Sequence, residues 1–71
     1  MLEYDGWVDV EIFALDGALI RTLLRERRAA GIHHITWDGT DERGLPVPSG
    51  VYFYRIKTLQ GVRTKKATVV R

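Results

Sequence analysis

The 71-residue sequence contains no cysteine, which excludes a disulfide framework and a thiolate metal centre. No apolar run approaches the roughly 20 residues that cross a bilayer, and no signal-peptide core is present. A chain this short buries only about 60% of its unfolded surface, so its core is modest. These absences leave one small domain over residues 1–71, with no insertion into a membrane and no convincing helix.

Neither sign of charge dominates. The formal net charge is +2, from 11 Lys and Arg against 9 Asp and Glu. Residues 1–35 hold four Arg and six acids (−2), and residues 36–71 hold seven Lys and Arg and three acids (+4). In the basic half, Arg55, Lys57, Arg63 and Lys65 alternate with apolar residues. This pattern is typical of a solvated strand face, and we predict no nucleic-acid partner.

Short runs rich in Val, Ile, Thr, Tyr and Phe lie between regularly spaced glycines, which is strand composition. Asp16-Gly17 indicates a hairpin with a type I′ turn, and Gln60-Gly61 indicates a second tight turn. Residues 25–30 are too short for a stable helix, so we expect a loop or a single turn there. Two prolines and three glycines make residues 38–50 an irregular connection. The predicted strands span residues 7–15, 18–24, 32–37, 51–59 and 62–70. Together they favour an all-β, small antiparallel sandwich of about six strands.

The loop at 38–44 holds three carboxylates, those of Asp38, Asp41 and Glu42. Calcium prefers such oxygen ligands, but the spacing does not match the twelve-residue calcium loop. Asp and Gly are also favoured in turns, where the Asp side chain caps backbone N–H groups. We therefore treat the three residues as weak metal candidates and expect a structural turn.

No catalytic constellation is visible. His33 and His34 are adjacent in a predicted strand, so their side chains point to opposite faces and cannot share a metal. Tyr52 and Tyr54 share a strand face and could stack on sugar rings, which leaves a carbohydrate-binding module as an alternative. A small core also needs aromatic side chains, and we expect Trp37 to fill it. The sequence predicts a non-enzyme with no cofactor.

Three blocks carry a family resemblance: VDVEIFALDGALIRTLL, AAGIHHITWDGTDERGLPVPSGVYFYRIKT and GVRTKKATVVR. They cover the chain from about Val8 to Arg71 and resemble the FlgD-type Ig-like domain. The same pattern is similar to the type A C-terminal sorting domain of the type IX secretion system. The residues that match the shared pattern are Asp16, Gly17, Gly31, Trp37, Asp38, Gly39, Gly44, Pro48, Gly50 and Tyr52.

The resemblance implies a non-catalytic Ig-like β-sandwich at the C-terminus of a larger, exported or cell-surface bacterial protein. Our main hypothesis is a structural or sorting module, and a hook-cap scaffold domain of the flagellum is the alternative. Its partners would be proteins: the secretion translocon, other domains of the parent chain, or hook subunits. If the domain is a secretion address, the recognition strand would include Lys65, Lys66, Val69, Val70 and Arg71.

The chain departs from the family pattern at its N-terminus. Family members usually carry one more strand before the one equivalent to residues 8–15, and residues 1–6 are too few to form it. The first family strand is therefore expected to be missing, which would leave an open sheet edge. Because an unpaired edge is a template for another strand, we predict self-association through that edge.

Overall fold

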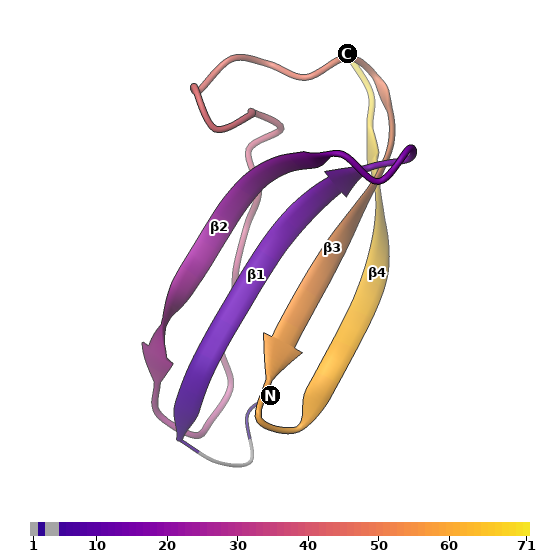
Figure 1. Cartoon of the computed structure of the whole chain (residues 1–71). Coiled ribbons are helices and arrows are strands. Elements are labelled where there is room, and N and C mark those ends of the chain that lie inside the picture. The colour runs from indigo at the N-terminus through magenta and orange to yellow at the C-terminus, as the bar shows by residue number, and fades with distance from the viewer. Residues whose placement is uncertain (1, 3–4) are drawn as a thin grey trace.

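A computed structural model describes residue 2 and residues 5–71. It contains one antiparallel sheet of four strands, in the order β2-β1-β3-β4 (Figure 1). The strands are β1 (Gly6–Ala14), β2 (Leu19–Arg28), β3 (Gly50–Thr58) and β4 (Gly61–Val69). The all-β prediction is therefore confirmed and is compatible with an Ig-like fold. Within the described residues, no helix is long and apolar enough to cross a membrane.

The period-two pattern of β1 sorts its side chains between two faces of the sheet. Val8, Val10 and Ile12 are at most 5% exposed and define what we call the inner face. Residues between them, such as Asp9 and Glu11, lie on the opposite, outer face and are only partly buried. Alternation along a strand produces this division, because successive side chains point to opposite sides of the backbone.

The β1–β2 hairpin forms at Asp16-Gly17 as predicted, but its turn is not type I′. No non-glycine residue among those described has a positive φ, whereas a type I′ turn needs one at both central positions. The loop is one residue longer: Ala14 N–H bonds to Ala18 O at 2.9 Å, and Gly17 takes φ +90°. The Asp16 carboxylate accepts the Ala18 N–H at 2.9 Å. This is the three-residue loop that ends in a left-handed glycine.

The prediction of a loop at 25–30 is wrong, because β2 continues to Arg28. Its second half pairs with the first half of β1, in the register Asp9↔Arg25 and Gly6↔Arg28. Arg25 also contacts the Asp9 carboxylate at 3.1 Å. The helix-favouring composition of this stretch is overridden because β1 offers backbone partners and an opposite charge.

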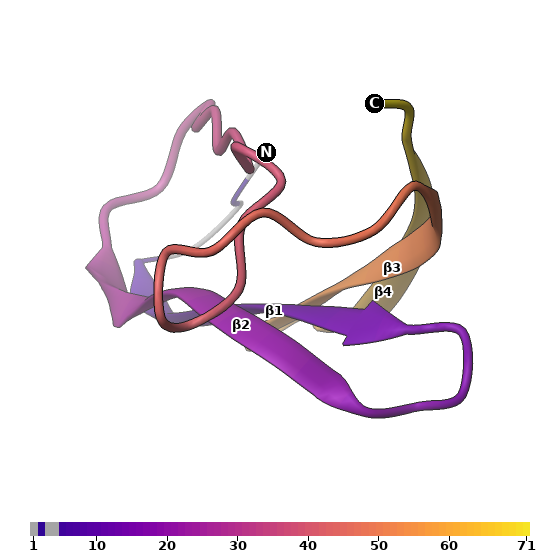
Figure 2. The same ribbon diagram turned by 90° about the horizontal axis from the view of Figure 1, so that it is seen from above.

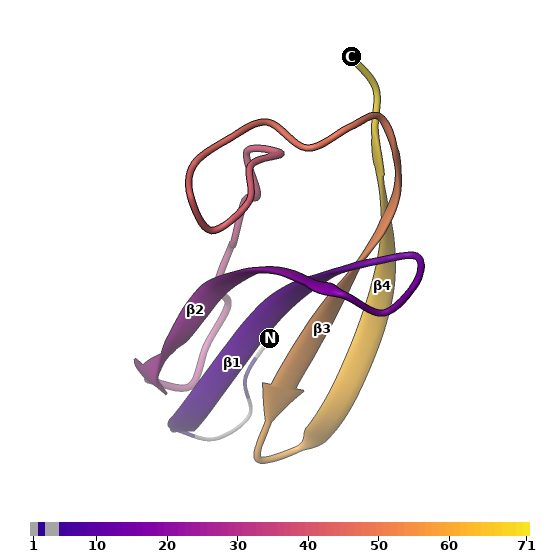
Figure 3. The ribbon, with the colours of Figure 1, turned by 45° about the horizontal axis from the view of Figure 1, so that its top comes forward.

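The predicted strand at 32–37 is also wrong. The prediction of about six strands is not met either, since the described residues form four. Residues 29–49, which we call the crossover segment, run irregularly from β2 across the inner face to β3 (Figures 2 and 3). Its ladder contacts are two isolated bridges, Leu2↔Gly31 and Thr40↔Pro46. The second layer of the domain is therefore this segment and not a second sheet.

The core lies between the inner face and the crossover segment. Ile12 (0% exposed), Val47 (5%) and Tyr52 (7%) form its centre. Partly buried side chains from the strands and from the segment pack around them: Ala14, Ile20, Leu23, Trp37, Tyr54 and Val69. Val47 is thus the most buried hydrophobic residue of the crossover segment, and together with Trp37 it packs the segment against the sheet.

Candidate functional site

The pattern residues Trp37, Asp38, Gly39, Pro48 and Tyr52 come together at one end of the inner face. The Trp37 ring meets the Tyr52 ring edge-on, with centroids 5.3 Å apart and planes at 66°. It also meets Tyr54 at 6.4 Å. Such edge-to-face pairs are the favoured aromatic geometry. The Trp37 indole N–H donates to Thr40 O at 2.8 Å, so the ring is fixed at both its apolar and its polar end.

Tyr52 ties β3 to the end of the crossover segment. Its hydroxyl donates to Pro48 O at 2.7 Å, across a four-residue separation in the chain. Because proline fixes its own φ, the acceptor carbonyl sits on a stiff stretch of backbone. Trp37, Pro48 and Tyr52 therefore act as one structural unit. The rings of Tyr52 and Tyr54, which could have offered a sugar-stacking surface, instead pack against Trp37 and hold the crossover segment on the sheet.

The three carboxylates of the 38–44 loop point to different partners. Asp41 Oδ1 accepts the backbone N–H groups of Arg43 at 2.9 Å and Leu45 at 3.0 Å. Glu42 Oε2 instead accepts the Thr22 N–H of β2 at 2.9 Å. The described part of the chain contains no group of three or more His, Cys, Asp or Glu side chains that could hold a metal ion. The carboxylates of Asp41 and Glu42 shape the turn and attach it to β2.

Asp38 sits in a tight hydrogen-bond turn. Its Oδ1 accepts both the Thr40 hydroxyl and, at 3.1 Å, the Thr40 N–H. Arg21 Nη1 lies 3.6 Å from the same oxygen. The Thr40 hydroxyl bond is the largest cause that lowers the pKa of Asp38, followed by the Thr40 N–H and the charge of Arg21, while partial desolvation opposes them. The turn thus favours the charged carboxylate.

Arg21, which lies within one of the family blocks, also belongs to this site. From β2, its Nη1 donates to the Thr40 hydroxyl and to Asp41 O at 3.4 Å. A single arginine therefore links β2 to three residues of the loop, Asp38, Thr40 and Asp41. Besides its place in the family block, the sequence signal for Arg21 is a charge between Ile20 and Thr22 on a predicted strand.

Arg71 is held by the crossover segment. Its Nε donates to Val47 O at 2.6 Å, its Nη2 to Gly39 O, and its backbone N–H to Ser49 Oγ at 3.0 Å. Gly39 has φ +78°, and a Cβ placed there would lie 2.8 Å from Arg71 Nη2. The positive φ favours glycine at this position, and a Cβ there would also displace the flexible end of the Arg71 side chain.

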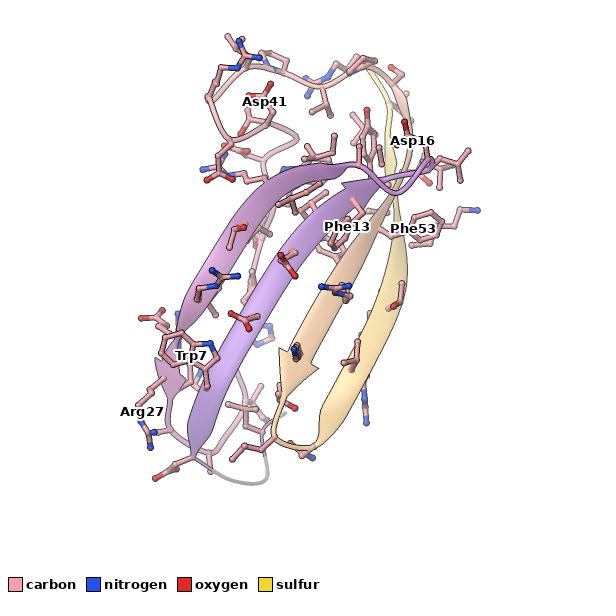
Figure 4. All side chains as sticks on the ribbon, in the orientation of Figure 1. Trp7, Phe13, Asp16, Arg27, Asp41 and Phe53 are labelled. Atoms are coloured by element: carbon pink, nitrogen blue, oxygen red, sulfur yellow. The ribbon has the colours of Figure 1, made fainter. Side chains whose placement is uncertain are left out.

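The other predicted site residues lie apart from this cluster. Asp16 and Gly17 form the β1–β2 loop at one end of the sheet, where Figure 4 shows Asp16, and Gly31 bonds to Leu2. Gly44 closes the acidic turn by donating to Asp41 O at 2.9 Å, and Gly50 starts β3. In the predicted recognition strand, Lys65 and Lys66 are exposed on β4, Val70 is 86% exposed, and Val69 packs against the core.

Aromatic side chains on the outer face do not form one platform. Figure 4 shows Trp7 near one end of β1, with Phe13 and Phe53 near the other. Six residues along a strand span about 20 Å, which is much longer than one sugar ring. Between them lie ion pairs, including Arg55 on Glu11 at 3.0 Å. The carbohydrate-binding alternative therefore gains no support from the placement of these rings.

The geometry defines a small all-β module whose pattern residues hold one irregular layer on one sheet. The family described as FlgD Ig-like domain matches residues 6–61, and the chain belongs to this family. The chain is 41% identical over 46 residues to the basal-body rod modification protein FlgD of Salmonella typhimurium, and equally to that of Salmonella typhi. The matches cover 65% of this chain and 20% of each relative, so the chain spans about one fifth of the curated relatives' length. No solved structure matches.

Proposed function

We propose that this domain is a non-catalytic module of a flagellar assembly protein, acting in hook assembly through protein–protein contacts. The family match over residues 6–61 carries the proposal, and the resemblance of the sequence blocks implies the hook-cap role. The curated relatives named basal-body rod modification proteins support the same direction. Hook subunits and the rest of the parent chain are the proposed partners.

The hydrogen bonds of the 38–44 loop and of Arg21 support a structural role. The side chains of Asp38, Asp41, Glu42 and Arg21 bond to groups of the loop or of the adjoining strand β2. A general base or nucleophile needs a free position from which to reach a substrate. These four side chains are held in hydrogen bonds and ion pairs, and they stabilise the loop and its attachment to β2.

The secretion-address hypothesis has weaker support than the hook-assembly role. The relatives are flagellar, and two of the residues proposed for the recognition strand contribute to the fold: Val69 packs on the core, and Arg71 bonds to Val47 O. We also propose an exported location, since the family resemblance implies a parent protein that is exported or on the cell surface.

A domain exchange tests the proposal. A chimera is made from the FlgD of Salmonella typhimurium, in which the matched 46-residue region is replaced by the corresponding residues of this chain. The chimera is then expressed in a strain that lacks its own FlgD. We expect hooks visible by electron microscopy and restored swimming, whereas an unrelated Ig-like domain of similar size restores neither. A chimera that accumulates normally and still builds no hooks would contradict the flagellar role.

A further inference from the structure

The two edges of the sheet differ in how they are protected. On β2, the acidic turn covers the first half of the edge: Glu42 N–H donates to Ile20 O at 3.1 Å, and Glu42 Oε2 accepts the Thr22 N–H at 2.9 Å. On β4, no loop of the described chain makes an equivalent backbone bond between Gly61 and Val69. Figure 1 shows β4 as the outermost ribbon on its side. Its outward N–H and C=O groups are therefore available to an added strand.

The register fixes which residues of β4 offer these groups. The two-residue loop at 59–60 makes Thr58 and Gly61 opposite residues, and a loop of this length is closed by a hydrogen-bonded pair. Every second residue from Val62 onward then directs its N–H and C=O away from β3. Thr64 lies in the middle of this series and is exposed.

The charge of β4 is of one sign. Its sequence GVRTKKATV has three cations, Arg63, Lys65 and Lys66, and no acid. None of the ion pairs among the described residues uses any of the three. By the pairing register, Arg63 and Lys65 lie on the inner face and Lys66 on the outer face. An added strand would place its own side chains directly beside these cations.

A groove of about 320 Å³ lies next to the β4 edge on the inner face. Leu24, Ile35 and Ile56 contribute its apolar lining, and Arg28, Arg63 and Lys65 contribute cations. No carboxylate lines it among the residues that the structure describes. The groove and the edge therefore present the same preference, for a segment that is negatively charged on its inner-facing side.

A second copy of the chain does not fit this edge. Two β4 strands side by side would bring cations together, and like charges opposite one another destabilise a sheet. The β2 strand is also basic, with four arginines against one glutamate, and its first half is covered by the acidic turn. The charges of the edges therefore argue against the self-association expected from the sequence.

We propose that β4 binds an extended segment of a partner protein in which acidic residues alternate with Val or Thr. The segment would add as a fifth strand, with backbone hydrogen bonds to Thr64 and its alternate neighbours. Its carboxylates would face Arg63 and Lys65 beside the groove, and its β-branched residues would lie on the outer face. This proposal adds the chemistry of the contact to the proposed function, and it is tested without flagellar assembly.

The first experiment titrates the 71-residue chain against a fluorescein-labelled nine-residue peptide that alternates Glu with Val and Thr, and follows fluorescence anisotropy. We expect saturable binding that weakens as salt is raised, because the pairs are exposed. The variant Arg63→Glu/Lys65→Glu should weaken binding at least tenfold. The matched control Arg27→Glu/Arg43→Glu has the same net charge and should change it less than threefold. Equal losses in both variants would overturn the proposal.

The second experiment tests the backbone contact. N-methylation of the peptide at alternate residues should abolish binding for the set that faces β4 and leave it within threefold for the other set. Thr64→Pro removes one outward N–H donor of β4 and should also abolish binding. The fold should accept the substitution, because proline is tolerated on an edge strand where the N–H faces solvent. Circular dichroism checks that the variant stays folded. If both methylated peptides bind alike, strand addition is wrong, even if Thr64→Pro unfolds the chain.

Three further outcomes separate the alternatives. A concentration-dependent dimer in sedimentation, with no binding of the acidic peptide, would assign the edge to a second copy and overturn the proposal. If the chimera builds hooks and the 71-residue chain does not bind the peptide, the proposal for β4 is contradicted and the flagellar role is not. Peptide binding by a chain whose chimera builds no hooks would do the reverse.

Discussion

The hydroxyl of Tyr52 gives a sharp test of how the crossover segment is held. Tyr52→Phe removes the 2.7 Å bond to Pro48 O and keeps the ring that packs against Trp37. Tyr52 is only 7% exposed, and a bond of this kind contributes about 1 kcal/mol net to the free energy of unfolding. For a domain of this size, that loss lowers the melting temperature by about 4–8 °C.

The matched control is Tyr54→Phe, because the Tyr54 ring also meets Trp37 and its hydroxyl makes no hydrogen bond to the described residues. Both variants are made in a Trp7→Phe background, which leaves Trp37 as the only fluorescent indole. Urea unfolding is then followed at Trp37. With a slope of about 1 kcal/mol/M, Tyr52→Phe should lower the midpoint by about 1 M. Equal midpoints for the two variants would refute the role given to the Tyr52–Pro48 bond.

Three further predictions follow from the core and the acidic turn. Ile12→Ala should destabilise the domain by about 2–5 kcal/mol in urea unfolding, whereas Ile32→Ala, at a site 73% exposed, should change it by less than about 0.5 kcal/mol. Calcium or a chelator should leave the melting temperature unchanged, because two carboxylates of the 38–44 turn bond to backbone N–H groups; a rise with calcium would contradict this. The Thr40 hydroxyl lowers the pKa of Asp38 in the folded state, so the stabilisation is present above the ordinary carboxyl value of about 3.9 and is lost as the pH falls through the lowered pKa. Asp38→Asn should therefore be less stable than the parent at pH 6, and the difference should shrink below pH 4.

The strands with strong alternation could be predicted from the sequence. In β1, the apolar positions at Val8, Val10 and Ile12 are the positions that the fold buries. The β3–β4 hairpin was equally visible, although its loop lies one residue earlier than predicted: it consists of Leu59 and Gln60, and Gly61 already pairs with Thr58 in the sheet. The end of β2 was not, since Arg25–Arg28 has no strand composition of its own. It becomes a strand because β1 lies beside it, and only tertiary pairing supplies that information.

The candidate site was predicted in part for a similar reason. Asp and Gly in the 38–44 loop correctly indicated a turn, because their preference is local. The contacts of Arg21 and Arg71 depend on residues far away in the chain, and nothing in their immediate sequence reveals them. The segment at 32–37 shows the limit most clearly. Its composition favours a strand, yet Ile32 is 73% exposed, and no strand in the described part of the chain pairs with residues 32–37.

The two sheet edges solve one physical problem in different ways. An exposed edge invites pairing with any extended chain, and proteins protect it with a loop or with charges such as lysine. At β2, the bonds of Glu42 to Ile20 and Thr22 close the first half of the edge with the protein's own chain. At β4, no loop of the described chain covers the outward backbone groups, and the edge carries the cations Arg63, Lys65 and Lys66. These cations repel a like-charged copy of the chain and do not block an acidic strand. An edge protected by charge alone is therefore selective rather than closed, and this distinguishes β4 from the first half of β2 as a surface for a partner.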